Sequence, residues 1–303
     1  MLLNPKRGVR EYPDEASREL MLAVIDFFES KGLARIKHDD HERIWYADFL
    51  GFVKDRQLFS SFLAPPEYGG DGCRWDTWRN CELNEILGFY GLAYWYTWQV
   101  TILGLGPIWM SDNEEVKGRT ADLLKQGGIF AFGLSEKEHG ADLYSSEMVL
   151  VPQADGTFLA RGEKYYIGNG NEAALVSVFG KVADADGAVP SDPKLTEYVF
   201  FVVDPRHESY ECIENVCNSQ NYVAHFALHD YPVREADILS RGRQAWDTSL
   251  NTVNVGKFNL GWASIGICTH AFYEALDHAC LLYTSDAADD DTIVGVSGGG
   301  GGG

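Results

Sequence analysis

The sequence has little positive charge. Its 303 residues contain 25 Lys and Arg against 45 Asp and Glu, which gives a net charge of −20. Because nucleic acids are bound by clustered cations, this balance disfavours a nucleic-acid partner. It is compatible with a small anionic ligand, since a local site can use backbone amides.

Long apolar runs and paired cysteines are also missing. No run of 18 apolar residues occurs, so we expect no membrane span. Residues 1–7 lack the hydrophobic region of a signal peptide. The six cysteines form no Cys-x-x-Cys pair. Scattered free thiols are typical of a cytoplasmic protein, and we predict no metal site.

The rest of the composition indicates a folded protein with more than one domain. Hydrophobic residues make up 45% and aromatic residues 13% of the chain, enough for a large core. The first 128 residues have the apolar spacing of helices, beginning with residues 14–30. The prolines and glycines of residues 64–72 predict an irregular loop. Ser111 and Glu114 form a capping box that predicts the start of the last helix of this region.

From residue 129 the pattern changes to short strands. Asp155-Gly156 lies between two of them and is a strong hairpin signal. Many short strands separated by turns indicate a small β-barrel or sandwich. The predicted strands are residues 129–134, 147–152, 157–161, 163–168, 173–181, 197–203 and 223–229.

Helical spacing returns after residue 240. Residues 246–279 carry Leu260, Ile265, Phe272 and Leu276 and are long enough for a bundle helix. From residue 281 the sequence becomes rich in Asp and ends in six glycines, which cannot specify a structure. We predict that residues 281–303 are a non-native tail without tertiary contacts.

Two segments of the predicted β region have the chemistry of a ligand site. Residues 130–142 run from an apolar strand into a polar turn that contains Ser135 and Gly140. Residues 162–170 follow about 25 residues later and contain Lys164 and Tyr166. A hydroxyl, exposed backbone amides and a glycine after a buried strand suit the close approach of a flat polar ring or a pyrophosphate.

Together the two segments resemble the flavin-binding segments of the acyl-CoA dehydrogenase family. The first is similar to that family's aromatic-x-hydrophobic-Thr/Ser-Glu-x-x-x-Gly-Ser-Asp run, and the second to its Gly-x-Lys-x-Trp-Ile-Thr-Asn run. Residues 65–72 resemble the family's Pro-x-x-Tyr-Gly-Gly-x-Gly loop. The resemblance covers about residues 14–279.

The resemblance implies an α+β multidomain fold. A helical N-terminal domain would span residues 1–128, and a flavin-binding β-barrel or sandwich domain would span residues 129–240. Residues 241–280 would then be the start of a truncated, helical-bundle C-terminal domain.

The resemblance also implies FAD as cofactor. Ser135, in the usual place of Thr, would hydrogen-bond the edge of the isoalloxazine ring, and Tyr166 would stack on the ring in the place of Trp. Gly168 stands where the family has Thr or Ser, so a side-chain donor near flavin N5 is lost. Ala141 replaces a Ser that reaches the pyrophosphate and the substrate. The implied cofactor residues are Phe132, Gly133, Leu134, Ser135, Gly140, Ala141, Tyr166, Ile167 and Gly168.

For the substrate, the resemblance implies contacts from Ala141, Asn254 and Lys257. The last two align with an Asp and an Arg that the family uses around the CoA moiety. Lys257 keeps the charge of Arg but not its bidentate geometry, and an ordinary helix start explains both residues equally well. One aromatic cluster is interpreted as core, with the wall of an acyl pocket as the alternative: Tyr94, Trp95, Tyr96 and Trp98.

Several other polar residues have simpler interpretations. Glu136 and Glu138 are interpreted as solvated turn residues, because the family's catalytic base does not come from this loop. His139 is interpreted as a surface residue, with anion binding as the alternative. His225 and His229 lie on one face of a predicted strand, where packing explains both better than zinc does.

The implied reaction removes the alpha proton of an acyl-CoA thioester to a carboxylate and the beta hydride to flavin N5. We therefore predict an FAD-dependent acyl-CoA dehydrogenase of fatty acid metabolism. Electron-transfer flavoprotein would be its electron acceptor, and the full-length protein would be a homo-oligomer. The base cannot be located, so we assign no catalytic residue and expect this chain to be inactive. The alternatives are an acyl-CoA oxidase and a non-catalytic flavin- or acyl-CoA-binding relative.

Overall fold

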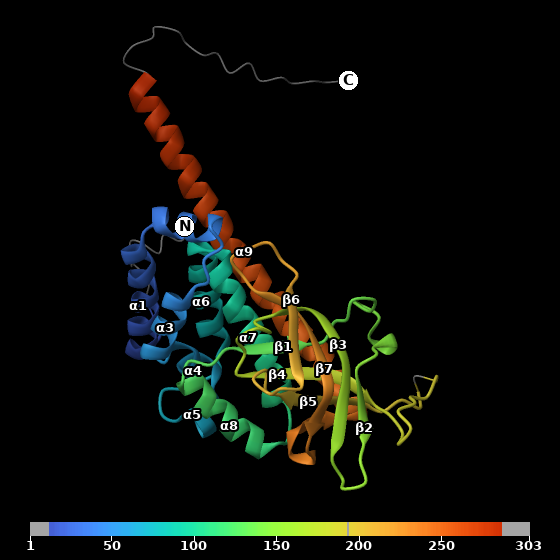
Figure 1. The fold of residues 1–303 in the computed structure, drawn as a ribbon. Coiled ribbons are helices and arrows are strands. Elements are labelled where there is room, and N and C mark those ends of the chain that lie inside the picture. The colour runs from blue at the N-terminus through green and yellow to red at the C-terminus, as the bar shows by residue number, and fades with distance from the viewer. Residues whose placement is uncertain (1–11, 193, 287–303) are drawn as a thin grey trace, which may run out of the picture.

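The computed structural model describes residues 12–192 and 194–286, and it has a helical part, a β part and one long final helix (Figure 1). This order confirms the predicted fold class. The helices of the first part are α1 (Glu15–Lys31), α2 (Leu33–His41), α3 (Ala47–Asp55), α4 (Leu58–Leu63), α5 (Pro66–Gly69), α6 (Thr77–Tyr90), α7 (Leu92–Trp109) and α8 (Glu114–Lys125). The final helix is α9 (Gly242–Asp286).

Helix α1 begins and ends where the sequence predicts. The Asp14 side chain accepts a hydrogen bond from the Ser17 backbone N–H at 2.8 Å and so caps the first turn. Gly32 follows the last residue with a φ of +77°, which an L side chain rarely adopts. Its backbone N–H donates to the Phe28 carbonyl and closes the helix.

The capping box predicted for α8 is wrong. Asn113 is the capping residue, and its side-chain oxygen accepts from the Val116 N–H at 3.0 Å. Asn113 also donates through its amide nitrogen to the carbonyls of Ala236 and Ile238, so it joins α8 to the β part. These two carbonyls lie more than 120 residues later in the chain, so their contact with Asn113 leaves no local pattern in the sequence.

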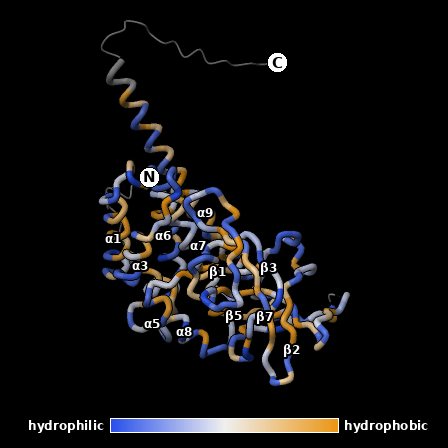
Figure 2. The backbone as a smooth tube through the Cα atoms, viewed as in Figure 1, coloured by the Kyte–Doolittle hydropathy of each residue, from blue (hydrophilic) through white to orange (hydrophobic). Residues whose placement is uncertain are grey.

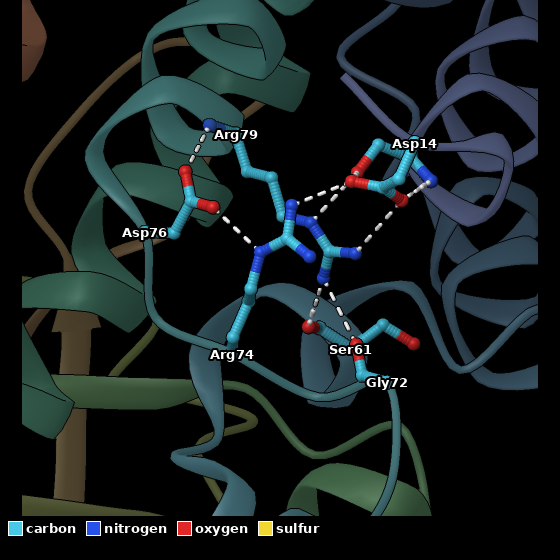
Figure 3. Close-up of polar contacts among 7 residues, drawn as sticks. Asp14, Ser61, Gly72, Arg74, Asp76 and Arg79 are labelled. Carbon is cyan, nitrogen blue, oxygen red and sulfur yellow. Dashed lines mark hydrogen bonds and ion pairs between the residues drawn. The ribbon is translucent and has the colours of Figure 1, made fainter. Parts of the chain in front are cut away.

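The loop predicted for residues 64–72 contains a short helix, α5. Pro66 occupies its first turn, where a missing N–H costs nothing. The loop is then held by the buried Arg79 at the start of α6, whose guanidinium donates to the carbonyls of Ser61 at 3.1 Å and Gly72 at 3.0 Å (Figure 3). Arg74 reaches Asp14 at 2.6 Å, so the starts of α1 and α6 are tied to one loop.

The strands form one mixed eight-stranded sheet. Their order is β6-β7-β3-β2-β4-β5-β8, with β1 paired to β4. The pairs β1–β4 and β2–β4 are parallel, and the others are antiparallel. The strands are β1 (Phe130–Gly133), β2 (Val149–Pro152), β3 (Phe158–Gly168), β4 (Leu175–Val182), β5 (Tyr198–Val203), β6 (Tyr210–Asn215), β7 (Val223–Val233) and β8 (Ile238–Arg241).

The strand predictions hold where apolar residues face a core. Gly156 has a φ of +84° in the turn between the antiparallel strands β2 and β3, which confirms the Asp155-Gly156 hairpin. Two strands were missed: β6, in which only Tyr210 is buried, and the four-residue β8. The two strands predicted at 157–161 and 163–168 are one strand, because pairing with β7 continues on both sides of Gly162, where the register shift places one extra residue in β7.

Helix α7 connects the helical part to the sheet. Gly104 lies so close to β1 that a Cβ there would come within 2.7 Å of the Ala131 backbone nitrogen. Ser177 of β4 donates its hydroxyl to the Gly104 carbonyl at 2.7 Å. In the aromatic cluster of this helix, Tyr94, Trp95 and Trp98 are buried and Tyr96 is half-buried.

Helix α9 packs closely at first and then extends away from the other elements (Figure 1). A Cβ on Gly88 of α6 would lie 2.5 Å from the Ala263 carbonyl oxygen, so the two helices touch at their backbones. Apolar and polar residues alternate along the extended end (Figure 2). Helix α9 continues to Asp286, six residues into the tail predicted for 281–303, and residues 287–303 lie outside the described residues.

Within residues 12–192 and 194–286, no helix combines the length and the apolar character needed to cross a bilayer.

Candidate functional site

The structure brings the two predicted ligand segments together. Ser135, just after β1, donates its hydroxyl to the Tyr165 carbonyl at 2.8 Å. The Tyr165 backbone N–H donates in return to the Ser135 carbonyl at 3.0 Å. Ser135, which follows β1, and Tyr166, which lies in β3, are therefore close in space, as expected if both contact one ring-sized ligand.

The polar turn after β1 is anchored by a buried ion pair. Glu136 accepts a hydrogen bond from the fully buried Lys164 Nζ at 2.7 Å. Glu136 also accepts from the backbone N–H groups of Glu147 at 2.6 Å and Met148 at 3.1 Å, and from the Ser146 hydroxyl. The interpretation of Glu136 as a solvated residue is wrong, because its charge is compensated inside the protein.

The two partners remain charged at neutral pH. Burial lowers the pKa of Lys164 to about 8, against the opposing effect of the Glu136 carboxylate. Burial acts to raise the pKa of Glu136, but Lys164, Ser146 and the Glu147 amide outweigh it and hold that pKa below its usual range. The turn is thus held by an ammonium and a carboxylate.

Lys164 also sets the direction of the peptide before Ser135. Its Nζ donates to the Leu134 carbonyl at 2.9 Å, on the buried side. In a trans peptide the carbonyl and the following N–H point in opposite directions. The Ser135 N–H therefore points away from the buried pair, and it donates to no acceptor among the described residues.

Tyr166 is turned outward by an irregularity in β3. The pairing of β3 with β7 shifts register between Lys164 and Ile167, and Tyr166 has a φ of +69°. Such a bulge re-aims a side chain. Tyr166 is 58% exposed, while the next residue, Ile167, is buried.

Asn169 fixes the end of β3 and was missed as a site-building residue. It is fully buried with a φ of +60°. Its amide nitrogen donates to the carbonyls of Phe130 at 3.1 Å and Thr97 at 3.2 Å, so it joins β3 to β1 and α7. An Asn between glycines after a strand is a local signal for this conformation, because Asn tolerates the left-handed region.

The other predicted cofactor residues divide into a wall and a loop. Gly133 and Gly168 are buried, and Phe132 and Leu134 are half-buried; Phe132 stacks on Phe200 with ring centroids 5.9 Å apart. Gly140 and Ala141 are exposed in the turn beyond Glu136. This leaves an exposed backbone loop next to the rim, while the wall behind it is packed.

The predicted substrate residues on α9 do not join this rim. Asn254 and Lys257 are both exposed on α9, and the side chain of neither makes a hydrogen bond or ion pair with another described residue. Gly256, between them, is buried against Gln99 of α7. Their role in CoA binding stays a prediction.

The histidines on β7 make separate contacts. His225 lies 2.8 Å from Glu163, and His229 lies 2.7 Å from Glu211. The described part of the chain contains no group of three His, Cys, Asp or Glu residues placed to hold a metal ion. Glu138 is exposed, as its interpretation required.

The arrangement presents an outward aromatic ring beside a backbone N–H and a polar turn. An aromatic face suits a flat ring, a directed N–H suits a ring acceptor, and exposed turn amides suit an anion. These features fit a flat heteroaromatic ligand with an anionic extension.

Comparison with known proteins is consistent with this chemistry. No protein-family model matches the chain. It is similar to the short-chain specific acyl-CoA dehydrogenase of Megasphaera elsdenii, with 21% identity over 88% of this chain and 69% of that protein. It is also similar to the mitochondrial very long-chain specific acyl-CoA dehydrogenase of Rattus norvegicus, with 26% identity over 86% of this chain but only 40% of that protein.

Solved structures share the fold. Butyryl-CoA dehydrogenase from Megasphaera elsdenii has a TM-score of 0.76 at 19% identity, covering 89% of this chain and 70% of that one. An acyl-CoA dehydrogenase from Bacillus anthracis, solved with FAD, has a TM-score of 0.70 at 21% identity, covering 88% and 43%. The prolyl acyl carrier protein oxidase AnaB has a TM-score of 0.73 at 17% identity, covering 88% and 69%. The fold is that of the acyl-CoA dehydrogenases, and the neighbours together point to that family.

Proposed function

We propose that this chain is part of an acyl-CoA dehydrogenase that binds FAD at the rim formed by Ser135 and Tyr166. The observation that carries the proposal is the reciprocal hydrogen bonding between Ser135 and Tyr165. It joins two segments that are separated in sequence and that resemble the flavin-binding segments of one family. The similarity to relatives and solved structures of that family supports the same proposal.

The residues present fit the cofactor. Tyr166 offers an exposed aromatic face, and the Ser135 N–H is directed outward by the contact of Lys164 with the preceding carbonyl. Ser135 Oγ already donates to Tyr165, so its lone pairs leave it as an acceptor for a ring N–H. The exposed turn at Gly140 and Ala141 would face the pyrophosphate through backbone amides.

FAD, when bound, supplies the acceptor for the hydride removed from the beta carbon of an acyl-CoA. The role of this chain is to orient the ring: Ser135 would hold one edge, Tyr166 would cover one face, and the packed strands behind them would exclude water. Asn254 and Lys257 would contact the CoA moiety. We assign no base among the residues of this chain.

Further properties of the whole protein follow from the same proposal. It would act in fatty acid metabolism in the cytoplasm, transfer electrons to electron-transfer flavoprotein and assemble as a homo-oligomer. The domains would be residues 1–128, 129–240 and 241–280. The chain spans only 40% of the second relative named above, so these remain proposals about a protein of that kind.

An acyl-CoA oxidase is the second candidate. The similarity to a prolyl acyl carrier protein oxidase shows that this fold also occurs in oxidases. The two activities differ in how fast the reduced flavin reacts with oxygen. Stopped-flow reoxidation of the FAD-loaded chain in air-saturated buffer would distinguish them, since rapid reoxidation favours the oxidase.

The proposal is tested by titrating the purified 303-residue chain with FAD and following the visible absorbance. We expect weak but saturable binding, and no reduction of ferrocenium with a panel of acyl-CoAs. Tyr166→Ala should weaken FAD binding about threefold to tenfold, because stacking of one aromatic pair contributes about 0.5–1.5 kcal/mol.

The matched control is Phe272→Ala, which removes a similarly exposed ring from α9 and should leave FAD binding unchanged. Absence of FAD binding by the unaltered chain would contradict the cofactor assignment. Turnover of an acyl-CoA would show instead that the base lies within these residues.

A further inference from the structure

Gly168 has no room for a side chain. A Cβ at this position would lie 2.6 Å from the Tyr96 hydroxyl oxygen and 2.8 Å from Val100 Cγ2. Its φ lies outside the left-handed region, so the backbone itself does not require glycine. The space that a side chain from β3 would fill is taken by a phenol from α7.

Tyr96 differs from its neighbours in the aromatic cluster. Trp95 and Thr97 on either side are buried, whereas Tyr96 is half-buried. Its hydroxyl makes no hydrogen bond with any residue in the described ranges. The phenol is thus a polar group that reaches the candidate flavin site without a protein partner.

The surroundings keep this phenol protonated. Burial raises the pKa of Tyr96, and the neighbouring Cys217 and Tyr166 act in the same direction. Cys217 and Tyr166 are themselves paired, with the thiol 3.3 Å from the Tyr166 hydroxyl. At neutral pH the Tyr96 hydroxyl can therefore donate a hydrogen bond. The neighbouring Cys217 and Tyr166 side chains are paired with each other and do not accept it.

We propose that the Tyr96 hydroxyl takes the place of a side chain at position 168 and donates a hydrogen bond to the isoalloxazine ring bound beside Gly168. The inference rests on the proposed function, because it needs the ring at this rim. The inference assigns a flavin contact to a residue of α7. It also means that Tyr96 can reach the ring because residue 168 has no side chain.

The first test is Tyr96→Phe in the full chain, with FAD affinity and the visible absorption spectrum of bound flavin as readouts. Loss of one neutral hydrogen bond should weaken FAD binding about twofold to tenfold and shift the flavin absorption maxima. Tyr94→Phe is the matched control: it removes a hydroxyl from the same helix, but its ring packs between Phe28 and Phe49. It should leave the affinity and the spectrum unchanged.

The second test exchanges the pair. Gly168→Ser should weaken FAD binding because its Cβ meets the phenol and Val100 Cγ2, whereas Tyr96→Ala/Val100→Ala/Gly168→Ser should bind FAD more tightly than Tyr96→Ala/Val100→Ala. If the unaltered chain binds FAD and Tyr96→Phe matches it in affinity and spectrum, this inference is overturned while the proposed function stands. If the unaltered chain binds no FAD, the proposed function fails and the inference with it.

Discussion

At the scale of single residues, Lys164 has the strongest structural role in the candidate site. Its ammonium contacts both Glu136 and the Leu134 carbonyl, and no part of its side chain reaches solvent. Lys164→Met leaves the Glu136 carboxylate buried without a counter-charge. We expect the free energy of unfolding, measured by urea denaturation, to fall by about 3–5 kcal/mol.

Two further variants test whether the loss of stability comes from the buried, unpaired carboxylate rather than from the loss of any ion pair. Arg161→Met breaks an ion pair with Asp230 in which both side chains are about half exposed, and it should change the free energy of unfolding by at most about 1 kcal/mol. Lys164→Met/Glu136→Leu removes both buried charges and should be more stable than Lys164→Met alone. Equal stability of the single and double variants would show that the unpaired carboxylate is not the cause.

Because of the buried pair of Lys164 and Glu136, we also expect the free energy of unfolding to depend on pH. The folded-state pKa of Glu136 lies below its ordinary value of about 4.3. The carboxylate therefore contributes stability above that value, and this contribution is lost as the pH falls through it towards the folded-state pKa. Urea denaturation at pH 7 and pH 4 should show a smaller loss for Lys164→Met/Glu136→Leu than for the unaltered chain. An identical loss would contradict this assignment.

At the scale of elements, the start of α6 holds the loop that contains α5. Arg79 is buried and donates to the carbonyls of Ser61 at the end of α4 and Gly72 in the loop (Figure 3). It also donates to the Ser17 hydroxyl of α1 at 2.9 Å. Arg79→Met removes the donor to the Gly72 carbonyl, leaves the Ser61 carbonyl with the Arg74 backbone N–H, and removes one of the two guanidinium groups beside Asp14. We expect a loss of about 3 kcal/mol in the free energy of unfolding.

Arg243→Met is the matched control for this prediction, because its side chain is 91% exposed and, within the described part of the chain, pairs only with Asp247 on its own helix. It should change stability by less than about 0.5 kcal/mol. Limited proteolysis supplies an independent readout, since cleavage within residues 64–76 should become faster in Arg79→Met and stay unchanged in Arg243→Met.

At the scale of the whole molecule, α9 exposes much apolar surface. Leu260, Ile265, Phe272 and Leu276 are each about half exposed in the described structure. Exposed apolar surface of this extent promotes association. We expect concentration-dependent self-association in sedimentation velocity, which should decrease when the four residues are replaced by Gln. Helicity by circular dichroism is the control, and unchanged association in this variant would exclude the α9 surface as the cause.

The order of a helical part, a β part and a final helix, and most of the elements within them, were determined by the sequence alone. Apolar spacing, the cap at Asp14 and the turn at Asp155-Gly156 act within a few residues, so they can be recognised without a fold. The segments around Ser135 and Tyr166 were likewise recognisable as a pair. Strand β6 was not, because one buried residue in six leaves no alternating pattern.

The tertiary structure alone decided which polar groups are inside and what lies against the glycines. Glu136 is buried because Lys164, 28 residues later, compensates its charge, and Asn113 caps α8 while also bonding residues near β8. Residue 168 has no room for a side chain because the phenol of Tyr96, 72 residues earlier in α7, lies against it. Such contacts depend on the packing of separate elements, and hydrogen bonds and close contacts act over a few ångströms in space rather than over positions in the chain.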